Sequence, residues 1–284
     1  MPPLSAHPAL PVHRSATLQR PDCRIHYEVT GEGPPIVFAH GLGGNHLSWW
    51  QQVPHFAPRH TCVAFSHRGF APSTPPSGGP DPLDFAGDIE ALLDLLALER
   101  PVIVAQSMGG WGAVEFALRH PGRLRGLVLA ATTGSLDPGR IEDGALQRRL
   151  EAWSADAQAR TADALAAGIH PAIGVRMAAE QPAHAHLYRA IDAMSAGLDK
   201  GALRGRLFAM RARRPEALAG AGCPVLFVAG DEDIVLPPFA ADAIAPMLPQ
   251  ARVVRFPDAG HSAYFERPDA FNLAVAAFMD ALPR

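Results

Sequence analysis

Short apolar runs and amphipathic segments alternate along most of the chain. Residues 14–19 and 23–30 resemble short strands, and the second run alternates polar and apolar positions, which predicts an antiparallel hairpin. Five later runs are apolar almost throughout, at residues 36–39, 62–65, 102–105, 127–130 and 224–229. A strand without a polar face is buried on both sides, so these runs predict a parallel sheet covered by helices. A further strand is predicted at 252–256.

Helical periodicity separates these strands. Apolar residues recur every three or four positions, and the predicted helices span residues 84–98, 109–120, 239–248 and 268–282. Residues 135–212 interrupt this alternation of strands and helices, because they are rich in alanine and arginine and carry no strand signal. We therefore predict several helices there, inserted into one α/β domain.

The domain boundaries follow from the same pattern. Residues 13–134 and 213–284 are predicted to form the α/β core, with 135–212 as the helical insertion and 1–12 as a flexible arm. The arm lacks the basic and apolar regions of a secretory signal. No run reaches the roughly 18 apolar residues of a membrane span. We expect no membrane partner and a cytoplasmic protein.

Composition and charge exclude other classes of protein. The chain has 284 residues, of which 48% are hydrophobic and 19% charged, as in globular proteins. Its net charge of −3 and the lack of a long basic block argue against a nucleic-acid partner. The three cysteines, Cys23, Cys62 and Cys223, are widely spaced, which argues against a disulfide framework and a structural zinc site.

A candidate nucleophile follows the predicted strand 102–105. Ser107 directly precedes the helix 109–120, so it lies on a tight strand-to-helix turn. Such a turn needs small residues two positions before and two after the serine, here Ala105 and Gly109. The alternative is a serine that caps an ordinary helix.

Three further motifs stand at the ends of predicted strands. A Gly-rich loop, 40–44, follows the run 36–39, and an acidic segment with Asp231 and Asp233 follows 224–229. The sequence Ala-Gly-His-Ser, which contains His261, follows the last strand. The four motifs therefore occur in the order Gly-rich loop, serine, acid and histidine.

In this order the motifs resemble those of the α/β-hydrolase family. The family's nucleophile turn reads G-x-S-x-G, and Ala105 stands here in place of the first glycine. The resemblance covers about residues 25–282. It implies an α/β-hydrolase fold, with a mostly parallel eight-stranded sheet flanked by helices and a helical cap at 135–212.

The resemblance also implies a catalytic triad. Ser107 would be the nucleophile, and His261 would take and return its proton. Family members carry the acid three residues beyond a glycine such as the one at 230, which selects Asp233 as the residue that orients His261. Asp231 and Asp137 are the competing acids.

By the same resemblance, the backbone N–H groups of Leu42 and Met108 would form an oxyanion hole. His40 is expected to hold the Gly-rich loop in place and not to act as a base. Trp111 is expected in the core.

The insertion is predicted to shape the substrate pocket, but it carries no motif that identifies the substrate. Its candidate lining residues are Trp153, Ile173, Met177, Tyr188, Met194 and Phe208. Helical spacing would place some of these inside the insertion's own core.

The predicted function is a serine hydrolase that cleaves a small-molecule carboxylic ester or lactone through an acyl-enzyme. The triad needs no cofactor. No metal is predicted, because the His-Ala-His segment at 184–186 lacks the acids of a metal-dependent lactonase. The alternatives are a carbon–carbon bond hydrolase of the meta-cleavage type, a cofactor-free perhydrolase or haloperoxidase, and a non-enzymatic ligand receptor on the same fold.

Overall fold

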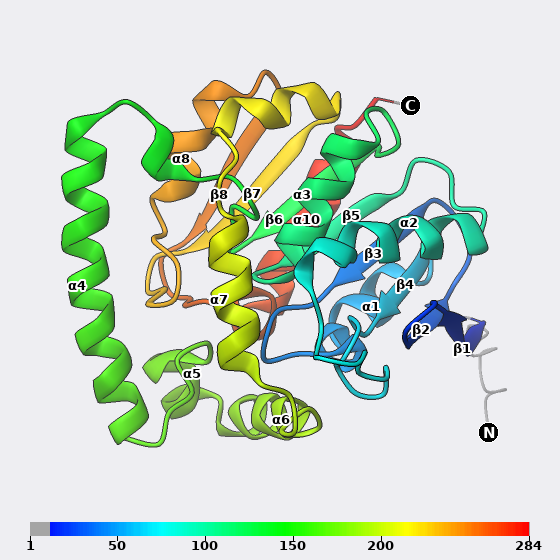
Figure 1. The fold of residues 1–284 in the computed structure, drawn as a ribbon, viewed down its shortest axis with the longest axis horizontal. Helices are drawn as coiled ribbons and strands as arrows, with labels where there is room; N and C mark the ends of the chain where they lie inside the picture. The colour runs from blue at the N-terminus through cyan, green and yellow to red at the C-terminus, as the bar shows by residue number, and fades with distance from the viewer. Residues whose placement is uncertain (1–11, 284) are drawn as a thin grey trace, which may run out of the picture.

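The computed structural model describes residues 12–283, so nearly all of the predicted flexible arm lies outside the described residues. Eight strands form one sheet (Figure 1). The strands are β1 (His13–Gln19), β2 (Arg24–Thr30), β3 (Pro35–Ala39), β4 (Thr61–Phe65), β5 (Val102–Gln106), β6 (Gly126–Ala130), β7 (Val225–Gly230) and β8 (Ala251–Phe256). Their order across the sheet is β1-β2-β4-β3-β5-β6-β7-β8. β1 and β2 pair antiparallel, as do β2 and β4, and all other pairs are parallel. The predicted mostly parallel eight-stranded sheet is confirmed.

Helices cover both faces of the sheet. Those outside the insertion are α1 (Gln52–Phe56), α2 (Phe85–Leu95), α3 (Gly109–Arg119), α8 (Ala240–Ile244), α9 (Ala263–Glu266) and α10 (Pro268–Asp280). Within β3, Val37 packs in the apolar cluster that includes α2, α3 and α8, whereas Phe38 packs in the cluster that includes α1, α9 and α10. Successive residues thus bury opposite faces, which is why these strands read as continuous apolar runs.

Short 3-10 segments connect several elements. They are η1 (His46–Trp49), η2 (Pro82–Asp84), η3 (Pro138–Arg140), η4 (Pro215–Ala221) and η5 (Ala245–Met247). The helix predicted at 239–248 is divided, because α8 ends at Ile244 and η5 continues the chain. Pro246 lies in η5, and a proline lacks the N–H that an α-helix needs at that point.

Four helices form the segment between β6 and β7. They are α4 (Gly144–Ala166), α5 (Gly174–Glu180), α6 (Pro182–Ala193) and α7 (Lys200–Met210). Asp143 begins the longest of them by accepting hydrogen bonds from the backbone N–H groups of Ala145 and Leu146. In Figure 1, α4 stands at the left edge of the molecule and α7 nearer the sheet. No helix in residues 12–283 has the length and apolar character to cross a bilayer.

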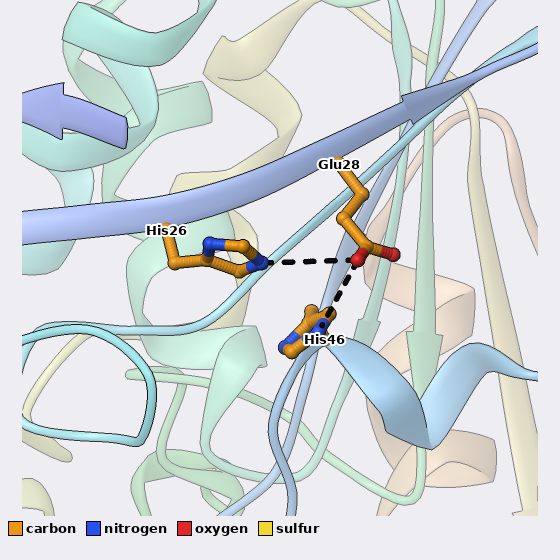
Figure 2. A group of neighbouring side chains, drawn as sticks. All are labelled: His26, Glu28 and His46. Carbon is orange, nitrogen blue, oxygen red and sulfur yellow. Dashed lines mark ion pairs between the residues drawn. The ribbon is translucent and has the colours of Figure 1, made fainter. Parts of the chain in front are cut away.

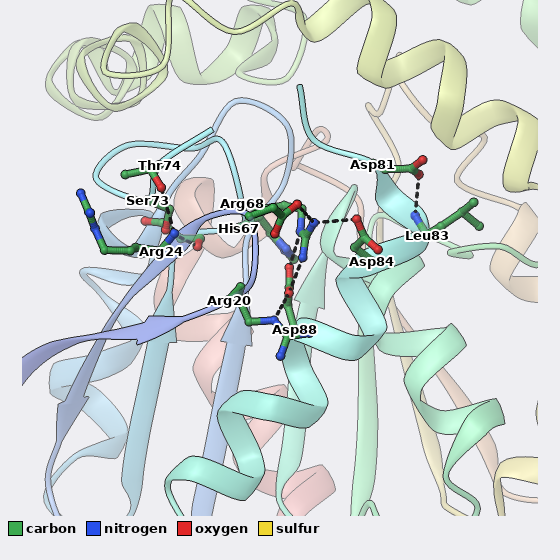
Figure 3. A network of polar contacts seen from close by, with 12 residues as sticks. Arg20, Arg24, His67, Arg68, Ser73, Thr74, Asp81, Leu83, Asp84 and Asp88 are labelled. Carbon is green, nitrogen blue, oxygen red and sulfur yellow. Dashed lines mark hydrogen bonds and ion pairs between the residues drawn. The ribbon is translucent and has the colours of Figure 1, made fainter. Parts of the chain in front are cut away.

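A buried ion-pair network fixes the loop after β4 (Figure 3). The Arg68 guanidinium donates from Nε and Nη2 to the two carboxylate oxygens of Asp88, each at 2.7 Å. Its Nη1 contacts Asp84 at 2.6 Å and Asp22 at 3.0 Å, and Arg20 also binds Asp88. Burial raises the pKa of Asp88, and the hydrogen bonds from Arg68 oppose that rise. The network joins the loop after β4 to α2. It thereby supports the end of the sheet at which the strands lead into the catalytic candidates.

Candidate active site

The turn that carries Ser107 is strained and closely packed. Ser107 has a φ of +46°, in the left-handed region that side chains rarely adopt. A Cβ at Gly109 would lie 2.3 Å from the carbonyl oxygen of Ala39, so glycine is needed there. Ala105 is fully buried in the core, which shows that the turn accepts a methyl group at that position. The chain turns sharply enough to present the Ser107 hydroxyl to the cavity.

Ser107, His261 and Asp233 form a continuous hydrogen-bonded chain. The Ser107 Oγ lies 2.8 Å from His261 Nε2, and His261 Nδ1 lies 2.8 Å from Asp233 Oδ2. The other carboxylate oxygen of Asp233 accepts from the backbone N–H groups of Val235, at 2.7 Å, and Leu236, at 3.0 Å. Asp233 is thereby oriented to hold the proton on Nδ1, which leaves Nε2 free to accept the serine proton.

The competing acids lie elsewhere. Asp231 forms an ion pair with Arg255 and is about one third exposed. Asp137 accepts a hydrogen bond from the backbone N–H of Gly139 at 2.9 Å, at the start of η3. Within residues 12–283, neither carboxylate has a hydrogen bond to His261.

The Gly-rich loop after β3 is held by a neutral histidine. His40 Nδ1 lies 2.8 Å from the carbonyl oxygen of Gly41, to which it donates, and His40 Nε2 accepts from the backbone N–H of His67 at 2.9 Å. Complete burial lowers the pKa of His40 to about 3, so the ring stays neutral near pH 7. His40 is thus placed to orient the loop.

Two backbone N–H groups near Ser107 have no acceptor. Leu42 and Met108 line the cavity together with Ser107. In the part of the chain that the structure describes, the N–H groups of Leu42 and Met108 donate to no protein oxygen. Unpaired donors of this kind are suited to an oxygen that gains negative charge.

Two residues that the sequence motifs did not single out hold the His261 loop. The buried Glu266 accepts hydrogen bonds from the backbone N–H groups of Gly260, at 2.9 Å, and Ser262, at 3.1 Å. Gln106 donates from Nε2 to the carbonyl oxygen of His261 at 3.1 Å. Burial raises the pKa of Glu266 to about 7. The sequence signal that could have indicated Glu266 is its position as an acidic residue directly after the apolar residues 263–265.

A cavity of about 580 Å³ contains Ser107 and His261 in its wall. Residues from the core and from α4, α6 and α7 line it. Its titratable residues from the insertion are His170, Tyr188, Asp192, Lys200, Arg204 and Arg211. Trp111 is buried, as expected, and it also lines the cavity.

The comparison with known families agrees with this geometry. A family model of the alpha/beta hydrolase fold matches residues 34–268, which is most of the chain. The chain belongs to the α/β-hydrolase fold family.

Several members of the α/β-hydrolase fold family are similar over nearly the whole chain. A protein of Mycobacterium tuberculosis (strain ATCC 25618 / H37Rv), named as the non-heme bromoperoxidase BpoC, is 31% identical over 89% of this chain and 96% of its own length. A protein of Caulobacter sp. (strain K31), named as the carbamate hydrolase RutD, is 30% identical over 90% of this chain and 95% of its own. The solved structure of Est816, described as an N-acyl homoserine lactone degrading enzyme, has a TM-score of 0.73 at 26% identity and covers 93% of this chain and 100% of Est816.

The structure divides the predicted lining residues of this α/β hydrolase into two groups. Tyr188 and Phe208 line the cavity that contains Ser107. Trp153 lines an adjoining cavity of about 460 Å³, whose wall also includes Phe208.

The other three predicted lining residues do not belong to either cavity wall. Ile173 and Met177 are fully buried in the apolar cluster around α1, α9 and α10. Met194 is 46% exposed, and its sulfur lies 3.3 Å from Asn45 Nδ2. Helical periodicity marks an apolar face, but it does not reveal whether that face meets a cavity or a neighbouring helix.

A group of three side chains that could ligate a metal ion lies outside the catalytic cavity (Figure 2). His26 and Glu28 come from β2 and His46 from η1. The Glu28 Oε1 lies 3.8 Å from His26 Nε2 and 3.6 Å from His46 Nε2, beyond hydrogen-bond length. Two imidazoles and a carboxylate are a donor set that zinc accepts, so these residues could hold a divalent cation. None of the three lines the catalytic cavity.

Proposed function

We propose that this α/β hydrolase cleaves a carboxylic ester or lactone through an acyl-enzyme intermediate. The observation that carries the proposal is the unbroken contact from Ser107 Oγ through the His261 ring to Asp233, with 2.8 Å at each step. Nucleophile, base and orienting acid are the three groups that acyl transfer to a serine requires.

In the proposed reaction, Ser107 Oγ attacks the carbonyl carbon while His261 Nε2 takes the hydroxyl proton. The carbonyl oxygen becomes negative and accepts hydrogen bonds from the N–H groups of Leu42 and Met108. His261 then gives its proton to the leaving alcohol, and the acyl group remains on Ser107. Water repeats the same steps and releases the acid, while Asp233 stabilises the charged ring of His261 in both halves.

We further propose that residues 135–212 form a cap over the nucleophile, between the core segments 13–134 and 213–284. The shared cavity wall supports this role, since it combines Ser107 with Tyr188 and Phe208 from the insertion. A cap of this kind excludes water and selects the acyl group, and it contributes no member of the triad. The described lactone-degrading activity of Est816 supports including lactones among the substrates.

A perhydrolase is the second candidate function, and the relative named as a non-heme bromoperoxidase favours it. In that reaction hydrogen peroxide replaces water in the second half. Its oxygen attacks the acyl-enzyme, His261 takes its proton, and a peracid leaves as Ser107 regains its hydroxyl. Bromination of monochlorodimedone in acetate, peroxide and bromide would reveal this activity, and its absence alongside ester hydrolysis would exclude it.

The test of the proposed function compares wild type with Ser107→Ala on p-nitrophenyl butyrate and on N-acyl homoserine lactones. We expect Ser107→Ala to lose ~10⁴-fold or more in kcat, because triad members act as a unit. A fluorophosphonate should phosphonylate Ser107 of wild type with loss of fluoride, which mass spectrometry detects as the added phosphonyl group, and it should leave the variant unmodified. Ser15→Ala, at an exposed serine on β1, is the matched control. Retention of a tenth of the activity by Ser107→Ala would refute the assignment.

A further inference from the structure

Arg211 carries a partly buried guanidinium that forms no ion pair with residues 12–283. It follows α7 directly, and its Nε and Nη2 are buried with no acceptor among residues 12–283. The central guanidinium carbon lies 5.1 Å from the centre of the Trp111 ring and 5.2 Å from that of Phe208. The two aromatic rings attract the charge, but they leave the hydrogen-bond donors unused.

Such a group is energetically unusual. Buried charges in proteins are normally paired, because their lost hydration must be replaced. Burial lowers the pKa of Arg211, and the Asp137 carboxylate opposes that change without forming an ion pair with it. The structure therefore holds a partly buried cation, two of whose donors have no acceptor among residues 12–283.

Arg211 belongs to the wall of the catalytic cavity. It lines that cavity together with Ser107 and His261. Trp111, which stacks against it, comes four residues after Ser107, or about one helical turn. Trp111 Nε1 donates to the carbonyl oxygen of Leu207 at 2.8 Å, so the ring that supports Arg211 is itself fixed.

The charges around Arg211 also favour an anion. The other charged residues that the insertion contributes to the wall are Asp192, Lys200 and Arg204. Lys200 Nζ lies 2.5 Å from Asp192 Oδ1, so these two neutralise each other. Arg204 and Arg211 form no ion pair within the described chain, which leaves an excess of positive charge in this part of the cavity.

We propose that Arg211 binds a carboxylate of the substrate, so that the preferred substrates are esters or lactones with a carboxylate a few bonds from the scissile carbonyl. A planar guanidinium matches a carboxylate through two parallel hydrogen bonds, and one partly buried positive charge balances one negative charge. The proposal rests on the proposed ester hydrolysis for its substrate class.

The kinetic test uses matched anionic and neutral esters. Mono-p-nitrophenyl succinate, glutarate and adipate carry a carboxylate at increasing distance, and their methyl esters are the neutral counterparts. We expect wild type to hydrolyse one of the three anionic esters with a higher kcat/KM than its neutral counterpart. Arg211→Gln should lower kcat/KM for that ester by about 30-fold or more, mainly through KM, and change the neutral ester by less than about threefold.

Arg206→Gln is the matched control, since it removes a cation from α7 whose guanidinium bonds the backbone oxygens of Pro80 and Gly78 outside the cavity wall. It should leave the anionic preference intact. Arg211→Lys keeps the charge but loses the paired hydrogen bonds, and it should retain part of the preference. Turnover of the neutral ester shows that each variant is folded.

A binding measurement separates this proposal from the proposed function. Calorimetry with glutarate should detect binding to wild type that Arg211→Gln abolishes, with glutaramide as the neutral control. If wild type cleaves no ester, the hydrolase assignment fails, whereas glutarate binding that depends on Arg211 would still support the site. Ester cleavage with no anionic preference, or an equal loss on both esters in Arg211→Gln, would overturn the carboxylate site and leave the hydrolase assignment standing.

Discussion

The side-chain amide of Gln106 donates a hydrogen bond to the backbone carbonyl of His261 at 3.1 Å. The residue before the nucleophile is thereby joined to the loop that carries the candidate base, although the two lie 155 positions apart in the chain. The side-chain oxygen Oε1 of Gln106 also occupies the space beside Gly41, where a Cβ would lie only 2.1 Å from it. One side chain therefore sets the relative positions of three loops around Ser107.

We expect Gln106→Leu to lower kcat about tenfold. The variant removes the donor and leaves the buried His261 carbonyl unpaired, which weakens the alignment of the ring with Ser107. Steady-state kinetics on p-nitrophenyl butyrate and a thermal unfolding curve would measure the change. An unchanged kcat in a folded Gln106→Leu protein would show that this bond does not position the histidine.

Asp233→Asn should reduce kcat by ~10⁴-fold, since an amide favours the wrong tautomer of His261, as in the serine-protease precedent. Asp231→Asn is the matched control, because that carboxylate pairs with Arg255 at the surface. It should change kcat by less than about threefold. The opposite ranking of the two variants would make Asp231 the acid.

Glu266 should make stability depend on pH. Its pKa of about 7 in the folded protein exceeds its ordinary value of 4.5, so the folded state binds the extra proton between these values. The free energy of unfolding should therefore fall as pH rises through this window, by about 3 kcal/mol at most.

Urea denaturation at pH 5 and pH 8 would measure that effect. The glutamine of Glu266→Gln does not titrate. The free energy of unfolding of this variant should therefore fall less between pH 5 and pH 8 than that of wild type. Equal losses in both proteins would contradict the raised pKa of Glu266.

Tyr188→Ala and Phe208→Ala should change the preference among acyl-chain lengths, because both side chains line the cavity. Each should shift the ratio of kcat/KM between short and long p-nitrophenyl esters by ~1–3 kcal/mol at most. Ile173→Ala and Met177→Ala are buried controls that should lower the melting temperature and leave that ratio unchanged. Unchanged ratios in the Tyr188 and Phe208 variants would contradict the proposed cap.

The sequence by itself determined the α/β architecture. Strands such as β3 and β5 are apolar on both faces, and this local pattern suffices to predict a parallel sheet with helices on either side. The motifs with Ser107, Asp233 and His261 stand directly after strands, and their resemblance to those of the α/β-hydrolase family predicted their candidate roles.

Only the tertiary structure decided which side chains meet across long distances in the chain. Ile173 and Tyr188 both pack in the same apolar cluster, yet only Tyr188 also lines the cavity. Glu266 follows the apolar residues 263–265, whereas Arg211 stands in a basic segment whose composition suits an exposed surface. The burial of Glu266 and the partial burial of Arg211 depend on residues that the fold brings beside them, as Trp111 is beside Arg211, and no local pattern encodes such contacts.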